Sequence, residues 1–136
     1  MNKSKGFTII ELIVVIAIIA VLATIVLVNV TGYINKGKDA SVQGNMATIM
    51  TNAAVYFDAN GNYTNFELSS GYTSASTAIR PNTAGKVAPT PYISASAYCV
   101  TAPLLAAGTT YCVDSTGYKG TVGAGRCESA ATSSCQ

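Results

Sequence analysis

The chain has 136 residues, with eight basic and six acidic side chains and a net charge of +2. This length accommodates one domain with at most a short appendage, and so few basic residues give no support for a nucleic-acid partner. The sequence has no histidine, no pair of acids at catalytic spacing and no glycine-rich phosphate loop. We therefore expect neither an enzyme nor a bound cofactor or metal.

The chain opens with a short polar leader followed by a long apolar run. Residues 1–6 are polar, and residues 9–28 are apolar except for Glu11 and Thr24. A helix of twenty residues, at about 1.5 Å per residue, spans the ~30 Å hydrocarbon core of a bilayer. We therefore predict that residues 7–30 form a helix that can cross a membrane.

The lysines around this run orient it only weakly. Lys3 and Lys5 precede the run and favour a cytoplasmic N-terminus, but Lys36 and Lys38 follow it and weaken that bias. Four cysteines clustered near the other end of the chain indicate disulfides, and hence an oxidising compartment. We therefore expect the C-terminal part to lie outside the cytoplasm.

Three explanations of the apolar run are possible, and they differ in the partner that each provides for the lone carboxylate of Glu11. An ordinary secretory signal would be cut after Ala23, a plain signal anchor would not be cut, and a third type would be cut between Gly6 and Phe7. A charge inside a bilayer normally has a partner. Cleavage after Gly6 supplies one, because the new amino group of Phe7 lies four residues before Glu11 on the same helix face. The alternative is that Glu11 only snorkels to the headgroups.

The stretch KGFTIIELIVVIAIIAVLATIV, which begins at Lys5, resembles the class III signal and N-terminal helix of type IV pilins and type II secretion pseudopilins. In that family a prepilin peptidase cuts after the glycine of a short basic leader and methylates the new first residue. A glutamate four residues further on pairs with that amine during assembly. The resemblance implies that residues 1–6 are the leader, that Gly6 and Phe7 are the cleavage and methylation site, and that Glu11 is the assembly residue.

The resemblance also implies a role for the whole protein. It predicts a structural subunit of a type IV pilus-like filament, a helical homopolymer whose partners are the prepilin peptidase and membrane-embedded assembly machinery. The precursor would cross the cytoplasmic membrane once, with its C-terminal part outside, and later enter an extracellular pilus. A pseudopilin of a type II secretion or DNA-uptake system is the alternative, and a secreted disulfide-rich binding domain with an ordinary signal is a third explanation.

After residue 30 the pattern becomes that of an amphipathic helix. Over residues 31–60 the apolar residues recur at helical spacing, namely Val42, Met46, Ile49, Met50, Ala53 and Phe57. Asn60 and Gly61 form a typical helix stop. We therefore predict one helix from residue 7 to about residue 59, roughly 80 Å long at 1.5 Å per residue. The family's proline near position 28 is absent, so a local break would fall at residues 29–32, where glycine and β-branched residues lower helix propensity.

Residues 61–97 are mostly small and polar, and we predict a loop-rich connector with one short strand. Asp58, Asn60 and Asn62 alternate like the start of a calcium loop. However, Tyr63 stands where such a loop needs glycine, and Ser69 stands where it needs glutamate. We therefore predict a helix cap and a turn at this point rather than a metal site.

Residues 98–136 contain β-favouring segments and all the cysteines, and predict a small sheet. The triplets that begin at Tyr98 and Tyr111 predict antiparallel strands that place Cys99 opposite Cys112, and a third strand is expected at residues 118–122. The four cysteines allow three connectivities. Pairing of sequence neighbours favours Cys99–Cys112 and Cys127–Cys135, and the crossed pairings stay open.

The whole chain is thus predicted to have an α+β fold. It consists of a long N-terminal α-helix, with a transmembrane first half and an amphipathic second half, and a small C-terminal antiparallel β-sheet head held together by disulfides.

Overall fold

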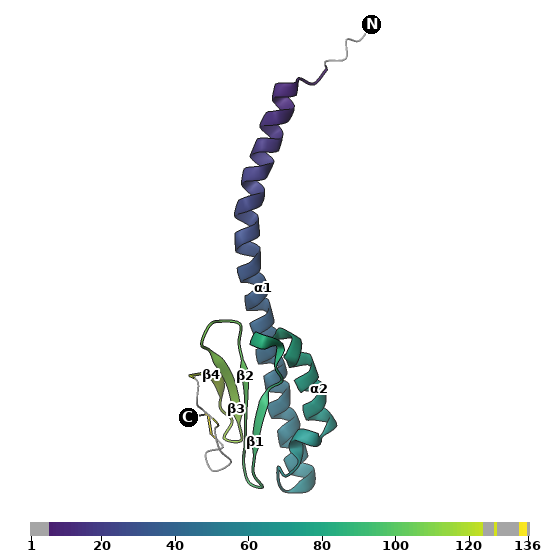
Figure 1. Ribbon diagram of the computed structural model, residues 1–136. Helices are drawn as coiled ribbons and strands as arrows, with labels where there is room; N and C mark the ends of the chain where they lie inside the picture. The colour runs from purple at the N-terminus through teal and green to yellow at the C-terminus, as the bar shows by residue number, and fades with distance from the viewer. Residues whose placement is uncertain (1–5, 124–126, 128–133, 136) are drawn as a thin grey trace. The chain divides into compact units, whose positions relative to one another are not determined.

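The computed structural model describes residues 6–123, 127, 134 and 135; the rest of the predicted leader lies outside this range. The chain divides into two compact units, Met1–Ile34 and Asn35–Gln136. Helix α1 (Ile9–Asn60) contributes to both units (Figure 1). The predicted long helix is therefore confirmed. It is continuous through residues 29–32, so the local break considered there is not present in this chain.

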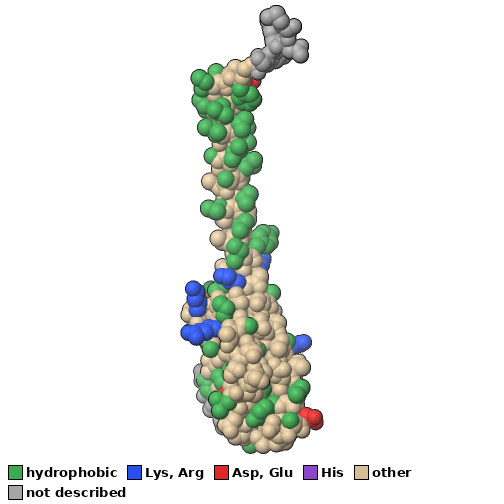
Figure 2. Space-filling view, turned by 90° about the vertical axis from the view of Figure 1, so that its right-hand side faces the viewer, with side chains coloured by type: hydrophobic (Ala, Val, Ile, Leu, Met, Phe, Trp, Pro, Cys, Tyr) green, Lys and Arg blue, Asp and Glu red, His purple; other side chains and the backbone are tan. Residues whose placement is uncertain are grey.

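The first unit is helical, and every side chain that is described in it is exposed. The large aliphatic side chains from Ile9 to Leu27 are between 44% and 78% exposed, and they cover this part of α1 (Figure 2). Among the described residues, α1 is the one helix whose length and composition allow it to cross a membrane. The predicted membrane-spanning segment is thus a helix with an apolar surface on all sides.

The second unit combines helices with a four-stranded antiparallel sheet (Figure 1). After α1 come α2 (Ser70–Ile79), β1 (Thr90–Ile93), β2 (Tyr98–Pro103), β3 (Thr110–Asp114) and β4 (Lys119–Val122), and the strands lie side by side in chain order. Short 3₁₀ helices occupy Phe66–Leu68, Arg80–Asn82 and Ala84–Lys86. The third predicted strand is β4, and the short strand predicted in the connector is β1.

One hydrophobic core joins α1, α2 and the sheet. Four α1 residues lie fully buried in it at steps of four, three and four: Val42, Met46, Ile49 and Ala53. This confirms that part of the predicted apolar stripe. Phe57 does not continue the stripe, since it is 40% exposed. Tyr56 packs against the core instead.

Helix α2 was not predicted in the connector. Its sequence, SGYTSASTAI, is rich in residues that are poor helix formers. It forms because Tyr72, Ala75 and Ile79 recur at helical spacing and are buried in the core. The hydroxyl of Ser69 caps its start by accepting a hydrogen bond from the Tyr72 N–H at 3.3 Å.

The register between β2 and β3 differs from the prediction by two residues. Cys99 lies opposite Asp114, and Thr101 lies opposite Cys112. The loop between the strands is held to α1, because the Asp39 carboxylate accepts hydrogen bonds from Leu105 N–H at 2.6 Å and Ala106 N–H at 3.2 Å. A shift of two residues leaves every side chain on its predicted face.

The two faces of the sheet are covered differently. Val100 and Val113 belong to the core beneath the helices. Cys99 and Cys112 alternate with them, so they point to the opposite face, where they cluster with Cys127, Cys135 and side chains of Tyr92, Tyr118 and Val122. The C-terminal cysteines therefore supply a second, smaller cluster on the outer face.

The disulfides are Cys99–Cys127 and Cys112–Cys135, one of the crossed pairings rather than the favoured neighbour pairing. The favoured pairing joined sequence neighbours, and in the predicted register Cys99 and Cys112 also lie directly opposite each other. In the observed register they do not, and each instead bonds a cysteine of the C-terminal segment. Each bridge thus ties that segment to a different strand.

Disulfide mapping tests this connectivity. Digestion of denatured, unreduced protein after Tyr111, Arg126 and Glu128 separates all four cysteines into different peptides. We expect mass spectrometry to find the Cys99 peptide joined to the Cys127 peptide. A peptide pair joining Cys127 to Cys135 would contradict the structure.

Candidate functional site

The predicted cleavage site lies at the exposed start of the first unit. Gly6 and Phe7 precede the helix, and Phe7 is 75% exposed. A Cβ added to Gly6 would meet no atom within 4 Å. The fold of this chain therefore places no steric demand on Gly6.

Thr8 and Glu11 form a reciprocal capping box at the start of α1. The Thr8 hydroxyl accepts a hydrogen bond from the Glu11 N–H at 3.3 Å. In return, Glu11 Oε2 accepts hydrogen bonds from the Thr8 N–H at 2.9 Å and from the Thr8 hydroxyl at 2.7 Å. These contacts satisfy backbone donors that a helix start leaves without an intrahelical partner.

This capping box was not predicted, although its signal is present in the sequence. A threonine followed three residues later by glutamate, directly before an apolar run, is the typical pattern, and Thr8-Ile9-Ile10-Glu11 matches it. Glu11 therefore has a role inside its own chain, in addition to the role implied by the family resemblance. Both hydrogen bonds to its carboxylate use Oε2, so Oε1 can accept one from an amine.

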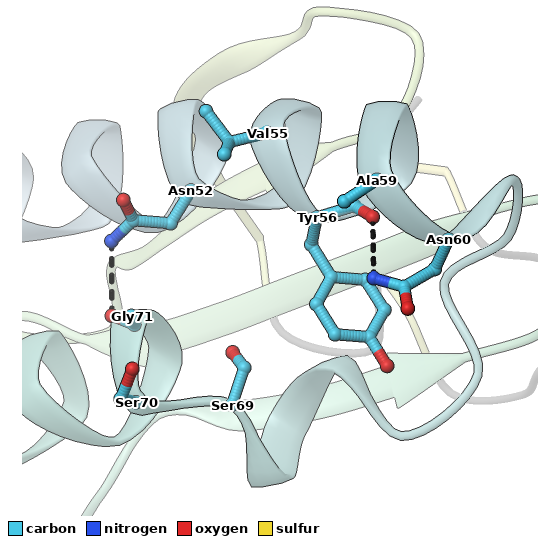
Figure 3. A pocket seen from close by; sticks show the side chains of 8 residues that line it. All are labelled: Asn52, Val55, Tyr56, Ala59, Asn60, Ser69, Ser70 and Gly71. Carbon is cyan, nitrogen blue, oxygen red and sulfur yellow. Dashed lines mark hydrogen bonds between the residues drawn. The ribbon is translucent and has the colours of Figure 1, made fainter.

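The second unit has a groove between α1 and the start of α2, of about 340 Å³ (Figure 3). Asn52 Nδ2 donates a hydrogen bond to the Gly71 carbonyl at 3.0 Å and closes one end of it. Asn60 Nδ2 donates to the Tyr56 carbonyl at 2.8 Å near the other end. No acid, lysine, arginine or cysteine is among the described residues that line this groove. Its polar side chains are the amides of Asn52 and Asn60 and the hydroxyls of Tyr56, Ser69 and Ser70.

The four cysteine sulfurs lie within 4.8 Å of one another, which is also the arrangement of a metal site. All four are paired in the two disulfides. A cysteine binds metal as a thiolate, and a disulfide sulfur is not one. The arrangement therefore serves to staple the C-terminal segment onto the sheet.

Asp114, at the end of β3, also holds Cys135 in place. Its fully buried carboxylate accepts a hydrogen bond from Cys135 N–H at 2.7 Å. It also accepts bonds from Thr116 N–H at 2.9 Å, the Thr116 hydroxyl at 2.6 Å and Tyr118 N–H at 3.2 Å. Burial acts to raise the pKa of Asp114, but the hydrogen bonds from Cys135, Thr116 and Tyr118 outweigh it and lower the pKa below its usual value.

This lowered pKa makes the stability of the second unit depend on pH. The contribution of Asp114 is complete above the unfolded pKa of 3.8, and it is lost as the pH falls through the lower folded value. The substitution Asp114→Asn leaves the Cys135 N–H or the Thr116 donors without an acceptor, and should destabilise the fold by about 1–3 kcal/mol at neutral pH.

Urea unfolding of the detergent-solubilised chain at neutral and acid pH measures this effect. The matched control is Asp58→Asn, since Asp58 is an exposed acid. We expect the control to unfold like the unchanged protein. Equal stability of Asp114→Asn and Asp58→Asn would contradict the role of Asp114.

Comparison with known families assigns the N-terminal segment. Residues 1–27 match the model of the prokaryotic N-terminal methylation motif. This motif is the class III signal of type IV pilins and pseudopilins, so the resemblance is confirmed over these residues. No curated protein and no solved structure matches the chain. The match covers the leader and most of the apolar run, and does not extend to the second unit.

Proposed function

We propose that this chain, a pilin-like precursor by its N-terminal signal, is a structural subunit of a type IV pilus-like filament. The observation that carries the proposal is the order of Gly6, Phe7 and Glu11 at the head of a helix whose apolar surface is exposed all round. A prepilin peptidase would cut between Gly6 and Phe7 and methylate the new terminus. The groups described in the second unit then form a head and not a catalytic centre.

Before cleavage the precursor stays in the membrane. The apolar part of α1 has the length and composition of a membrane span. The disulfides require an oxidising compartment, which supports an orientation with the second unit outside the cytoplasm. The leader, with Lys3 and Lys5, then lies on the cytoplasmic side, where the peptidase would act.

Assembly replaces lipid with copies of the same helix. In water the exposed aliphatic surface of α1 is unfavourable at about 25 cal/mol per Å², so outside the membrane it has to be buried against neighbouring subunits. Glu11 is the one charge described within this surface. Its Oε1 would accept a hydrogen bond from the Phe7 amine of the same chain or of a neighbour, while Oε2 keeps the capping box closed.

The cleavage step can be tested at Gly6. Because a side chain at this position meets no other atom, Gly6→Leu should fold and insert normally but stay uncut. We expect the full-length precursor to accumulate in the membrane fraction of the native host. A processed chain from this variant would count against the proposed cut site.

The assembly role of Glu11 can be separated from its capping role. Glu11→Gln keeps a side chain that can close a capping box but removes the charge, whereas Glu11→Val removes both. We expect both variants to be cleaved. Both should reduce the yield of sheared filaments roughly tenfold or more, the effect of 1.4 kcal/mol on an equilibrium.

Electron microscopy of the sheared fraction gives the readout. Normal filaments from Glu11→Gln would mean that Glu11 acts only as a cap, and would overturn its pairing with the amine.

Fibre length in the unchanged protein distinguishes a pilin from a pseudopilin, the two classes of protein that carry this signal. Long surface fibres support a pilin, and short fibres confined to the envelope support a pseudopilin.

A further inference from the structure

Four cations gather at one end of the second unit. Lys36 and Lys38 lie on α1 at the start of this unit, and Arg80 and Lys86 follow α2; all four are exposed. Figure 2 shows Lys and Arg side chains gathered toward this end, and an acidic side chain near the other end of the same face. We call Lys36, Lys38, Arg80 and Lys86 the basic collar.

One hydrogen bond links the two halves of the basic collar, and three more hold the segment after α2 in shape. Asn82 Nδ2 donates to the Ser41 hydroxyl of α1 at 3.4 Å, and so holds the segment after α2 against the start of the unit. The buried hydroxyl of Thr83 lies 3.0 Å from the Arg80 carbonyl and 2.7 Å from the Val87 carbonyl. Arg80 Nε donates to the Lys86 carbonyl at 3.3 Å. The collar is therefore a folded feature and not a set of scattered lysines.

In the part of the chain that the structure describes, little negative charge lies near the basic collar. Asp39 is on the same part of α1, but both of its oxygens accept backbone hydrogen bonds from Leu105 and Ala106. Asp58 lies seventeen residues beyond Ser41 on α1, about 25 Å further along at 1.5 Å per residue. The collar end thus carries a clear excess of positive charge.

The two α1 lysines of the basic collar follow the membrane-spanning run closely in the sequence, so they lie near a membrane surface. Lys36 follows the last residue of the apolar run by eight helical positions, about 12 Å. This distance is within reach of the headgroup layer and its surface potential, because the potential decays over roughly 10 Å and long basic side chains extend toward the headgroups. Arg80 and Lys86, more than forty residues later in the sequence, belong to the same end of the second unit through the Asn82–Ser41 contact.

We propose that the basic collar binds anionic phospholipid headgroups on the outer surface of the membrane while the precursor is still anchored there. The partner is a lipid surface, recognised through phosphate groups by three lysines and one arginine. Release of the head for assembly would then require these contacts to break. This inference rests on the membrane stage of the proposed function, and does not depend on filament formation.

Lysine acylation of the full chain in vesicles tests the proposal. The probes are vesicles of phosphatidylcholine alone and vesicles of equal parts phosphatidylcholine and phosphatidylglycerol, treated with a membrane-impermeant acylating reagent. Lys86 is the informative residue, because Lys36 and Lys38 stay near the surface through their tether alone. Lys119, on β4 near the end of the sheet that holds Asp114, is the internal control.

We expect Lys86 to be acylated several-fold more slowly in the anionic vesicles, and we expect high salt to remove the difference. Lys119 should react equally in both. The variant Arg80→Gln should weaken the protection of Lys86, whereas Lys119→Gln should not. Equal acylation of Lys86 in the two kinds of vesicle would overturn the proposal.

Two further outcomes would also overturn it. Protection of Lys86 that appears in both kinds of vesicle, and grows with the ratio of protein to lipid, would mean that the collar meets the acidic end of a second copy, near Asp58 and Glu67. Release of the chain from both kinds of vesicle by alkaline extraction would show that the chain is not anchored in the membrane. The inference rests on that anchoring and would fall with it. Failure of filament assembly in a host would leave the lipid result unchanged, so the two proposals fail separately.

Discussion

The apolar surface of the first half of α1 is the constraint on which the rest of the molecule depends. Its aliphatic side chains from Ile9 to Leu27 are exposed on all sides, and no arrangement within the first unit buries them. Such a surface is stable in a bilayer, or packed among other apolar helices, but not in water. The N-terminal methylation motif over residues 1–27 is the signal of pilin-like precursors, and it fits a precursor anchored in a membrane through this helix.

The second unit has to be stabilised in another way, because it is small and has few large aliphatic residues. The helices cover one face of its sheet with a conventional core. On the other face Cys127 and Cys135 cluster with the cysteines of the sheet, and two disulfides and the Asp114 carboxylate hold these two residues in place. Disulfides of this kind typically contribute about 2–4 kcal/mol each. That contribution matters most in a small domain, and it ties the stability of the head to an oxidising environment.

Features set by local sequence could be predicted, and features set by distant contacts could not. The apolar span, the amphipathic stripe from Val42 to Ala53 and the strand at residues 119–122 each follow from a local pattern. The β2–β3 register and the disulfide pairing instead involve residues far apart in the sequence, and the β2–β3 loop also contacts Asp39, 66 residues before Leu105. Helix α2 was hidden by a composition of poor helix formers. The capping box of Thr8 and Glu11 was readable from the sequence but was overlooked, because the family resemblance already offered an explanation for Glu11.

The measurement that tests the central claim most directly is the mass and N-terminal sequence of the protein from the native cell envelope and from the sheared surface fraction. The account predicts a chain in both fractions that begins with N-methylated Phe7. A chain that begins at Thr24 would contradict it, because the apolar helix would then be a discarded signal and the second unit an ordinary secreted domain. A chain that keeps Met1 in both fractions would contradict it as well, since the helix would then be a permanent anchor.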